Sequence, residues 1–542
     1  MIKSLIAPAC LACLALPFSR AVPAVPATPG VISAPVAAAL PGRALTNEAS
    51  LVGALYSGPT SRLLWLEHAQ PSHQAAELLA ELSSSEAYGL RPEDYGVAAL
   101  AVACRDLHDT DRQARCDQLL STAALRLLSH LHYGRVDPRA AGFELPEPRH
   151  DLDLVAAVNA LAESAHVADA IAAVEPHFYH YGLLKSALAR YRILAADPTL
   201  SQLPRPTRPN LRAGDTYEGA PGLRRLLAAL GDLPPAPESE SAELRLDPLL
   251  TRALQRFQTR HGLPADGTLG AATYQALIAP LAQRVRQIAL TLERWRWLPP
   301  FDSPPIIVNI PQFRLFAFRS TADRAADIMQ MAVIVGQTYP RTRTPVFMGQ
   351  LRTVIFRPYW DVPRSILLHE LLPKIQANPD YVHRNSFEIV RGEGDDGRVQ
   401  ETTPATIGAL AAGQLRLRQR PGADNALGLV KFLFPNVHNV YLHSTPAHQL
   451  FAQSRRTFSH GCIRVSDPVA LAAHVLRNAA GNWDAAHIEA AMQGSDARRV
   501  ELLRPIDVMI LYATVQATEA GPVEFFDDIY GHDRRLARLL AG

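Results

Sequence analysis

The sequence reads Val440-Tyr441-Leu442-His443-Ser444-Thr445-Pro446 and, with fifteen residues between His443 and Ser459, Ser459-His460-Gly461-Cys462-Ile463-Arg464-Val465. β-Branched and aromatic residues bounded by proline or glycine are typical of short strands, so the first stretch is predicted to end a strand. The second stretch is predicted to be strand-like, and Asp467-Pro468 after it is typical of a helix start. Cys462 is therefore expected close to the point where a strand gives way to a helix.

Short apolar stretches of the same kind surround this pair. Residues 306–310 and 332–335 are rich in β-branched side chains, and the pattern returns at 507–515. They predict a mainly β region over 300–542. A stretch of helical and polar character, 366–425, interrupts the pattern, and long insertions of this kind are often lids or ligand-binding elements. We therefore expect an inserted capping or lid subdomain.

The preceding part of the chain has helical periodicity. Residues 75–82 and 119–128 carry apolar side chains at intervals of three and four, which predicts a helical region over 45–200. A proline-rich linker, 201–210, separates this region from 211–279. Leucine stripes, helix-capping residues and tight turns in 211–279 predict a small three-helix unit.

The first residues have the form of a secretory signal. Lys3 precedes an apolar run over 5–16, and Ser19-Arg20-Ala21 offers small residues for cleavage, so 1–21 is predicted to be removed on export. An N-terminal helix of the folded protein is the alternative. Residues 22–44 are rich in proline and alanine and predict a flexible tether. No transmembrane segment is expected after removal of the signal.

The charge balance narrows the class of partner. The chain has 54 basic and 52 acidic residues, for a formal net charge of +2. A nucleic-acid-binding protein needs a basic surface, so this balance argues against nucleic acid as a partner. Hydrophobic residues make up 48% of the 542 positions, enough to bury the cores of several domains.

The cysteines fall into three groups. Cys10 and Cys13 lie in the predicted signal. Cys104 and Cys116, twelve positions apart in the helical region, either pair in an oxidising compartment or remain two thiols. Cys462 is left without a partner, more than 340 residues further along. An unpaired cysteine in an exported protein indicates a thiol whose reactivity is used.

Cys462 and the nearby histidines allow nucleophilic chemistry. An imidazole within reach of a thiol can take its proton and leave a thiolate–imidazolium pair that attacks a carbonyl group. Backbone N–H groups around Gly461 and Cys462 are expected to stabilise the resulting oxyanion. One alternative is a buried, inert cysteine. Another is a zinc site built from Cys462 with His443, His448 and His460, although beyond the predicted signal the sequence has no Cys-x-x-Cys or His-Glu-x-x-His pair.

The spaced His443 and Ser459-His460-Gly461-Cys462 motif resembles the signature of the L,D-transpeptidases, whose catalytic domain is of the YkuD type. Residues 211–279 look like a peptidoglycan-binding domain, and 45–200 is similar to a scaffold domain. Further stretches resemble the long, YcbB-like branch of the family: 292–299, 308–311, 419–422, 425–428, 431–432, 434–436 and 528–533. The resemblance implies a multidomain α+β fold with a helical scaffold domain, a three-helix peptidoglycan-binding domain and a mainly-β catalytic domain that carries the lid.

The family implies roles for individual residues by position. Cys462 matches the nucleophile and His443 the general base. Tyr441 lies on the same strand face as His443 and is expected in the pocket or the oxyanion hole, unless it is a packed aromatic. Many relatives carry aspartate where this chain has Ser444. In the family the third partner of the base is usually a backbone carbonyl near this position, which is available whatever the side chain. The other candidate oxyanion or substrate contacts are Gly461, Ser459, His460, Arg464 and Trp360, the last of which core packing explains equally well.

The implied activity is that of a peptidoglycan L,D-transpeptidase. Cys462 would attack the bond after the third residue, meso-diaminopimelate, of a tetrapeptide donor stem, and D-alanine would leave. The side-chain amine of a diaminopimelate-containing acceptor stem would then take the acyl group and form a 3-3 cross-link. The family also implies that carbapenems acylate Cys462 and that no cofactor or metal is needed.

The expected location is the periplasm, in association with the cell wall, with a role in cell wall biogenesis and cell shape. Two other functions remain open. One is an L,D-carboxypeptidase or endopeptidase-type hydrolase of the same fold, because the sequence does not reveal the acceptor. The other is a non-catalytic wall-binding scaffold in which 211–279 does the binding.

Overall fold

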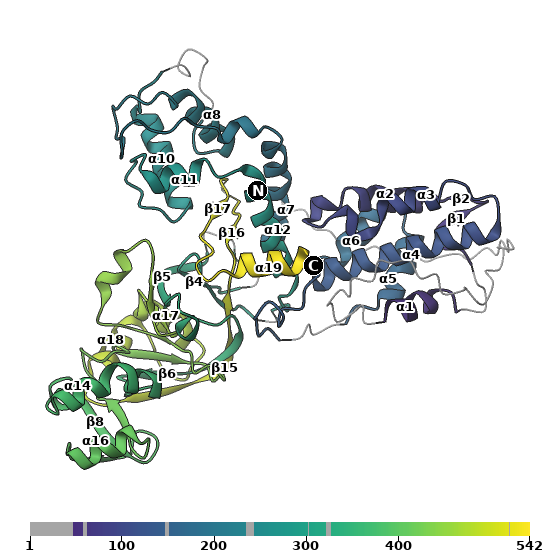
Figure 1. Ribbon diagram of the computed structural model, residues 1–542. Helices are drawn as coiled ribbons and strands as arrows, with labels where there is room; N and C mark the ends of the chain where they lie inside the picture. Colours follow the sequence, from purple (N-terminus) through teal and green to yellow (C-terminus); the bar gives the residue numbers. More distant parts are fainter. Residues whose placement is uncertain are drawn as a thin grey trace.

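The computed structural model describes residues 47–57, 62–146, 151–234, 243–301, 303–320, 323, 327–519 and 521–541. The predicted signal peptide, 1–21, and the predicted tether, 22–44, lie outside the described residues. Figure 1 shows three lobes that meet near α7 (Tyr179–Ala195), α12 (Leu281–Arg296) and α19 (His532–Ala541). Within the described ranges, no helix combines the length and the apolar content needed to cross a bilayer.

The N-terminal lobe is a helical bundle around one long helix, α4 (Thr110–Tyr133). This helix begins after Asp109, whose side chain accepts a hydrogen bond from the Arg112 N–H. Its apolar face packs with the neighbouring helices in one core. The surrounding elements are α1 (Glu48–Leu55), β1 (Leu66–Glu67), β2 (Gln70–Pro71), α2 (His73–Ser83), the 3-10 helices η2 (Ser85–Tyr88) and η3 (Pro92–Tyr95), α3 (Val97–Ala103), α5 (Leu154–Glu163) and α6 (Val167–Val174).

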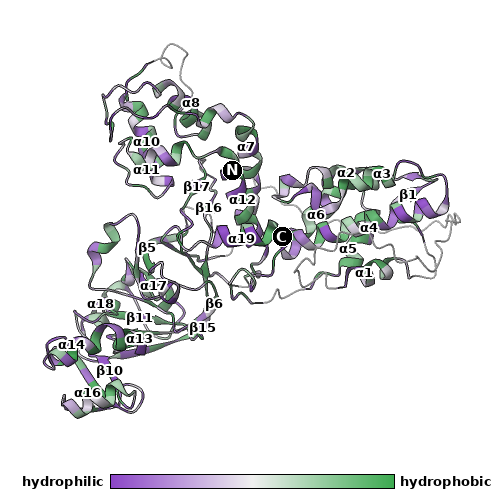
Figure 2. Ribbon diagram, in the orientation of Figure 1, coloured by the Kyte–Doolittle hydropathy of each residue, from purple (hydrophilic) through white to green (hydrophobic). Residues whose placement is uncertain are grey.

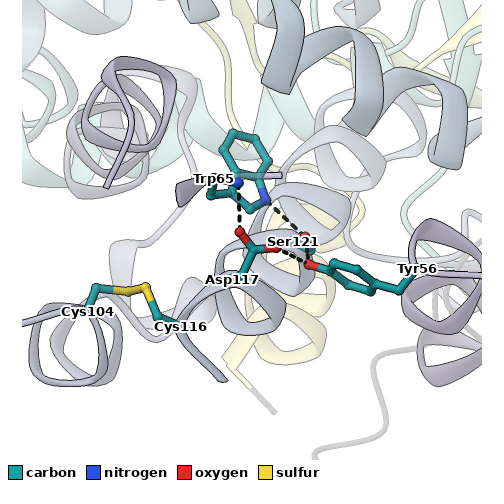
Figure 3. The surroundings of a disulfide bond; sticks show 6 residues. All are labelled: Tyr56, Trp65, Cys104, Cys116, Asp117 and Ser121. Atoms are coloured by element: carbon teal, nitrogen blue, oxygen red, sulfur yellow. Dashed lines mark hydrogen bonds between the residues drawn. A yellow bond between two sulfur atoms is a disulfide. The ribbon is translucent and has the colours of Figure 1, made fainter. Parts of the chain in front are cut away.

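The two cysteines of this lobe form a disulfide. The bond between Cys104 and Cys116 ties the end of α3 to α4 (Figure 3). Next to it, the buried Asp117 carboxylate accepts hydrogen bonds from the Trp65 backbone N–H (2.7 Å) and the Tyr56 hydroxyl (2.6 Å). Burial raises the pKa of Asp117, and these donors oppose the rise. One turn of α4 thus contacts three separate segments of the lobe, which carry Cys104, Trp65 and Tyr56.

Loss of the disulfide is expected to destabilise the N-terminal lobe. A bridge that closes a loop of this length restricts the unfolded chain, and its removal costs roughly 2–3 kcal/mol. We expect the Cys104→Ala/Cys116→Ala variant to melt about 5–10 °C below the wild type when helix unfolding is followed by circular dichroism. The melting temperature of the wild-type protein should fall by the same amount when a thiol reductant is present. An unchanged melting temperature would show that the bridge contributes no stability.

The second lobe contains the three helices predicted over 211–279: α8 (Ala220–Leu230), α10 (Pro248–Arg260) and α11 (Ala271–Leu277). The Asp247 side chain caps α10 by accepting hydrogen bonds from two N–H groups of its first turn. The same core takes in α7 and α12 together with η4 (Pro198–Ser201) and the hairpin of β16 (Val515–Gln516) and β17 (Glu524–Phe525). The predicted helical region 45–200 is therefore shared between two cores, since Leu184 and Leu188 of α7 are buried in this one.

The third lobe is built on a nine-stranded sheet that closes on itself. The strand order is β13-β5-β14-β12-β11-β6-β15-β3-β4, and β4 also pairs with β5. Alternate residues of the strands pack on α17 (Pro468–Leu476), which is largely hydrophobic (Figure 2), and on α18 (Ala485–Gln493). The strands are β3 (Ile306–Asn309), β4 (Arg314–Ala317), β5 (Met329–Gly336), β6 (Met348–Phe356), β11 (Val430–Leu433), β12 (Leu442–His443), β13 (Thr457–Ser459), β14 (Ile463–Val465) and β15 (Arg498–Leu511), and two 3-10 helices lie between them, η5 (Pro340–Thr342) and η7 (His448–Ala452).

The insertion predicted at 366–425 belongs to a subdomain with its own core. The sequence predicts helical and polar character, but the subdomain also has a four-stranded sheet in the order β7-β10-β8-β9. Short, charge-rich strands such as Arg416–Gln419 carry too little apolar alternation to be recognised from sequence. The elements are β7 (Trp360–Asp361), α13 (Arg364–Ile366), the π-helix η6 (Leu367–Leu371), α14 (Leu372–Ala377), α15 (Tyr381–Arg384), β8 (Phe387–Arg391), β9 (Arg398–Gln400), α16 (Pro404–Ala411) and β10 (Arg416–Gln419).

Candidate active site

Strand pairing places the candidate catalytic residues on one face of the large sheet. Strand β12 runs parallel to β14 with His443 beside Arg464, and the Ile463 N–H donates to the Tyr441 carbonyl (3.1 Å). Paired residues project to the same side of a sheet, and side chains alternate along each strand. Leu442 and Ile463 point into the core. The residues on the opposite face are therefore Tyr441, His443, Cys462 and Arg464.

The loop before Cys462 is fixed by hydrogen bonds within itself. The buried Ser459 hydroxyl donates to the Cys462 carbonyl (2.5 Å) and accepts from the Gly461 N–H (3.1 Å). Gly461 has a φ of +119°, which a side chain would disfavour, and its carbonyl accepts from the Thr344 hydroxyl (2.8 Å). The Gly461 N–H, expected as an oxyanion donor, is thus engaged by Ser459. This leaves the N–H of Cys462 itself as the backbone donor next to the sulfur.

The Cys462 thiol is partly exposed at the end of this loop. Its Sγ donates to the Asn439 carbonyl at 3.6 Å, and the Tyr441 hydroxyl and N–H act as hydrogen-bond donors toward the sulfur. Burial raises the pKa of the thiol above its ordinary value, although Tyr441, Lys431 and Arg464 each oppose the rise. The thiol is therefore protonated at neutral pH and needs a base to become a nucleophile.

His443 is buried and held in one tautomer. Its Nδ1 lies 2.5 Å from the Ser444 carbonyl oxygen, so Nδ1 carries the proton and the Nε2 lone pair is the basic position. This carbonyl is the third partner expected for the base, and Ser444 supplies it through its backbone. Burial, Arg464 and Lys431 lower the pKa of His443 to about 3. The carbonyls of Ser444 and Leu427 oppose this fall by accepting hydrogen bonds from the ring. The imidazole is therefore neutral at neutral pH.

Tyr441 links the other members of the site. Its ring centroid lies 5.7 Å from that of His443, with the ring planes at 61°. Burial and the adjacent Cys462 raise the pKa of Tyr441 well above its ordinary value, while Trp360 of β7 lowers it. The phenol therefore stays protonated and acts as a hydrogen-bond donor. The contact also brings Trp360, a weak candidate from sequence alone, to the site.

Lys431 is a member of this face that the motif does not indicate. It pairs in register with His443, and its Nζ lies 4.0 Å from the centroid of the Tyr441 ring. Burial lowers the pKa of Lys431, and the neighbouring Cys462 and Asp395 oppose the fall. The sequence does contain a signal for this position. Lys431 stands between the apolar Val430 and Phe432, and the alternation of side chains along a strand puts it on the face opposite the core.

The inserted subdomain reaches the loop before Cys462 at His460. The His460 Nε2 lies 2.5 Å from the Glu370 Oε1 on η6, so the partner of this histidine is a carboxylate of the insertion. Asp395 of the same subdomain lies within electrostatic range of Lys431, and Trp360 contacts the Tyr441 phenol. Three elements of the insertion therefore meet the face that carries Cys462.

The zinc alternative concerns the same histidines. Within the residues that the structure describes, no group of three or more histidine, cysteine, aspartate or glutamate side chains is arranged to hold a metal ion. His443 uses Nδ1 for the Ser444 carbonyl and His460 uses Nε2 for Glu370. The Cys462 thiol lies next to the Tyr441 phenol and on the same sheet face as the neutral His443 imidazole.

The charge states of this site predict how Cys462 reacts with iodoacetamide. The thiolate is the reactive form, and the pKa of the thiol is raised, so the rate should rise about tenfold per pH unit between about pH 6 and pH 9. His443 stays neutral down to about pH 3, so it adds no inflection near neutrality. Intact mass at each pH measures the rate, with Cys462→Ala as the unlabelled control. A plateau below pH 8 would instead reveal a preformed thiolate–imidazolium pair.

Three family models match separate parts of the chain. Residues 50–188 match "Scaffold domain", residues 222–277 match "Putative peptidoglycan binding domain", and residues 304–489 match "L,D-transpeptidase catalytic domain" of the YkuD type. The last match contains β12, the loop before Cys462, β14 and the inserted subdomain. The predicted combination of a helical, a peptidoglycan-binding and a β-rich part is thereby confirmed.

Individual proteins similar to this chain include one relative and one solved structure. A Haemophilus influenzae protein named "Putative L,D-transpeptidase" is 31% identical over 254 residues, which cover 46% of this chain and 49% of the relative. The chain thus matches about half the length of that relative. The structure of an L,D-transpeptidase (residues 123–326) from Xylanimonas cellulosilytica covers 57% of this chain and 100% of its own, at 14% identity and a TM-score of 0.16, a score too low to support an argument. On the family matches, the chain combines a YkuD-type L,D-transpeptidase catalytic domain with a peptidoglycan-binding domain and a scaffold domain.

Proposed function

We propose that this protein is a peptidoglycan L,D-transpeptidase that forms 3-3 cross-links through an acyl-enzyme on Cys462. The observation that supports this most is the shared sheet face, where a partly exposed thiol lies beside a protonated phenol and a buried, neutral imidazole is on the same face. A neutral imidazole can accept the thiol proton, and a phenol can stabilise developing negative charge.

The first half-reaction uses the tetrapeptide donor. As Sγ bonds to the carbonyl carbon of the third residue, meso-diaminopimelate, the thiol proton passes to Nε2 of His443. The Cys462 N–H and the Tyr441 hydroxyl would stabilise the oxyanion. When the tetrahedral intermediate collapses, the C–N bond breaks and His443 returns its proton to the leaving amine of D-alanine. The product is a thioester on Cys462.

The second half-reaction uses the acceptor stem. Its side-chain amine attacks the thioester carbonyl and gives a proton to His443, while the C–S bond breaks. The thiolate regains a proton from the imidazolium, and the new amide is the 3-3 cross-link. Ser444, through its carbonyl, would keep the imidazole oriented through both halves, and Ser459 and Gly461 would hold the loop. Neither step needs a metal or a cofactor.

The peptidoglycan-binding domain, the inserted subdomain and the disulfide are consistent with a function at the cell wall. The peptidoglycan-binding domain would hold the glycan mesh near the active site. The inserted subdomain would cover the donor, since its Glu370, Trp360 and Asp395 lie near His460, Tyr441 and Lys431. A periplasmic location after export would place the enzyme with its substrate and would suit the Cys104–Cys116 disulfide. Carbapenems would act as inhibitors by acylating Cys462.

Product analysis with purified tetrapeptide muropeptides tests this function. Cross-linked dimers with release of D-alanine are expected. If tripeptide forms without dimers, water is the acceptor, and the protein is a hydrolase instead of a transpeptidase. Unchanged tetrapeptide in the presence of folded protein would contradict both and favour the wall-binding scaffold.

A further inference from the structure

A row of side chains crosses the sheet through His443. Strand register places Arg464 of β14 beside His443, His443 beside Lys431 of β11, Lys431 beside Ile355 of β6, and Ile355 beside Arg499 of β15. Neighbouring strands lie about 4.8 Å apart, so His443 has a cation on each side at the distance of one strand. Both cations lower the pKa of His443.

The two cations that flank His443 form no ion pair within the described residues. Lys431 is half-buried, with Asp395 of the insertion in electrostatic range only. Arg464 is also half-buried, and its Nε lies in the protein without a hydrogen-bond partner. Arg499, further along the row, differs because it is exposed and its Nε contacts the Glu501 carboxylate at 2.6 Å. Cations held out of water without a counter-ion indicate a place where an anion binds.

The proposed reaction brings one anion, the terminal carboxylate of the donor, close to Lys431 and Arg464. His443 must reach the nitrogen of the leaving residue to protonate it. In a tetrapeptide donor that residue is the last, and its carboxylate carbon is only about 2.5 Å from that nitrogen, two bonds away. The groups on either side of His443 are therefore the ones that a terminal carboxylate meets.

We propose that Lys431 and Arg464 form a subsite for the terminal carboxylate of the leaving residue, so that the donor must end one residue after the scissile bond. This inference rests on the proposed function and adds the rule for donor choice. A bound carboxylate also offsets the two cations beside His443, so an imidazolium forms more readily once a correct donor is in place. Donors that are amidated or extended at this position lose both effects.

Donor pairs that differ only at the C-terminus test the subsite. For the wild type, kcat/KM is expected to be about 30-fold higher for the tetrapeptide acid than for its C-terminal amide. Lys431→Met should lower that preference to about threefold by slowing the acid donor, whereas Lys431→Arg, which keeps the charge, should retain most of it. Arg499→Gln is the matched control, since its charge already has a partner, and should keep the wild-type preference. Equal slowing of both donors by Lys431→Met would overturn the proposal.

Alkylation separates failure of this subsite from failure of the proposed function. Iodoacetate carries a carboxylate and iodoacetamide does not, and both react with Cys462 without any peptide. The rate ratio of iodoacetate to iodoacetamide should fall about tenfold in Lys431→Met and stay unchanged in Arg499→Gln. An unchanged ratio in Lys431→Met overturns the carboxylate subsite whether or not peptides are converted. A fall in the ratio with no peptide conversion by the wild type would support an anion site and refute the transpeptidase function.

Discussion

Cys462→Ala is expected to stop conversion of tetrapeptide muropeptides, with a loss of at least about 10⁴-fold in kcat/KM. The loss is large because the acyl-enzyme needs a nucleophile at this position of the loop. The neighbouring groups, the Tyr441 phenol and the His443 imidazole, would orient and activate the thiol and do not replace it. Chromatography and mass analysis of the muropeptides measure the residual conversion.

A cysteine variant elsewhere provides the control for this result. The Cys104→Ala/Cys116→Ala variant removes the disulfide of the N-terminal lobe and should keep its activity below its melting temperature. Retained conversion by Cys462→Ala would assign the chemistry to another residue. Loss of activity in the double variant at low temperature would mean that the N-terminal lobe contributes to catalysis.

His443→Gln is expected to lower kcat by about 10²–10⁴-fold, the range for loss of a general base. The raised pKa of the Cys462 thiol makes the base necessary at neutral pH. At a pH above the raised pKa of the thiol, where thiolate forms without help, alkylation of Cys462 by iodoacetamide should be nearly the same in the variant and the wild type. That retained reactivity distinguishes a lost base from a collapsed site. The measurements are steady-state rates and intact mass.

His460→Gln is the matched control for the base. His460 is in the same loop as Cys462, but its Nε2 contacts Glu370 of the insertion. Glutamine can keep a hydrogen bond to that carboxylate, and an exposed contact of this kind contributes only about 0.2–1 kcal/mol, so the change in kcat should stay within about fivefold. If His460→Gln lost more activity than His443→Gln, the base would be His460.

The domain architecture could be predicted from sequence because each part carries its own pattern. The leucine stripes and the Asp247 cap mark the three helices, and the β-branched stretches mark the closed sheet. The spaced histidine and cysteine mark the site, since strands β12 and β14 are adjacent and parallel. The pairing of Cys104 with Cys116 stayed open, because spacing alone does not reveal whether α3 and α4 bring the two thiols together.

Other features depend on contacts that no local pattern reveals. Lys431 reaches His443 only through the register of β11 with β12, and Glu370 meets His460 across ninety positions of chain. The use of the Gly461 N–H by Ser459 follows from the shape of one loop. The strands of the insertion are too short and too charged to show alternation. Each of these is a property of three-dimensional packing.

Mass analysis after carbapenem treatment tests the role of Cys462 most directly. Wild-type protein is incubated with meropenem, its intact mass is measured, and a digest under non-reducing conditions locates the change. We predict one adduct, on the peptide that contains Cys462, with Cys104 and Cys116 still joined in their disulfide. A folded protein whose Cys462 remains unmodified, or an adduct on any other residue, would contradict the assignment of Cys462 as the nucleophile.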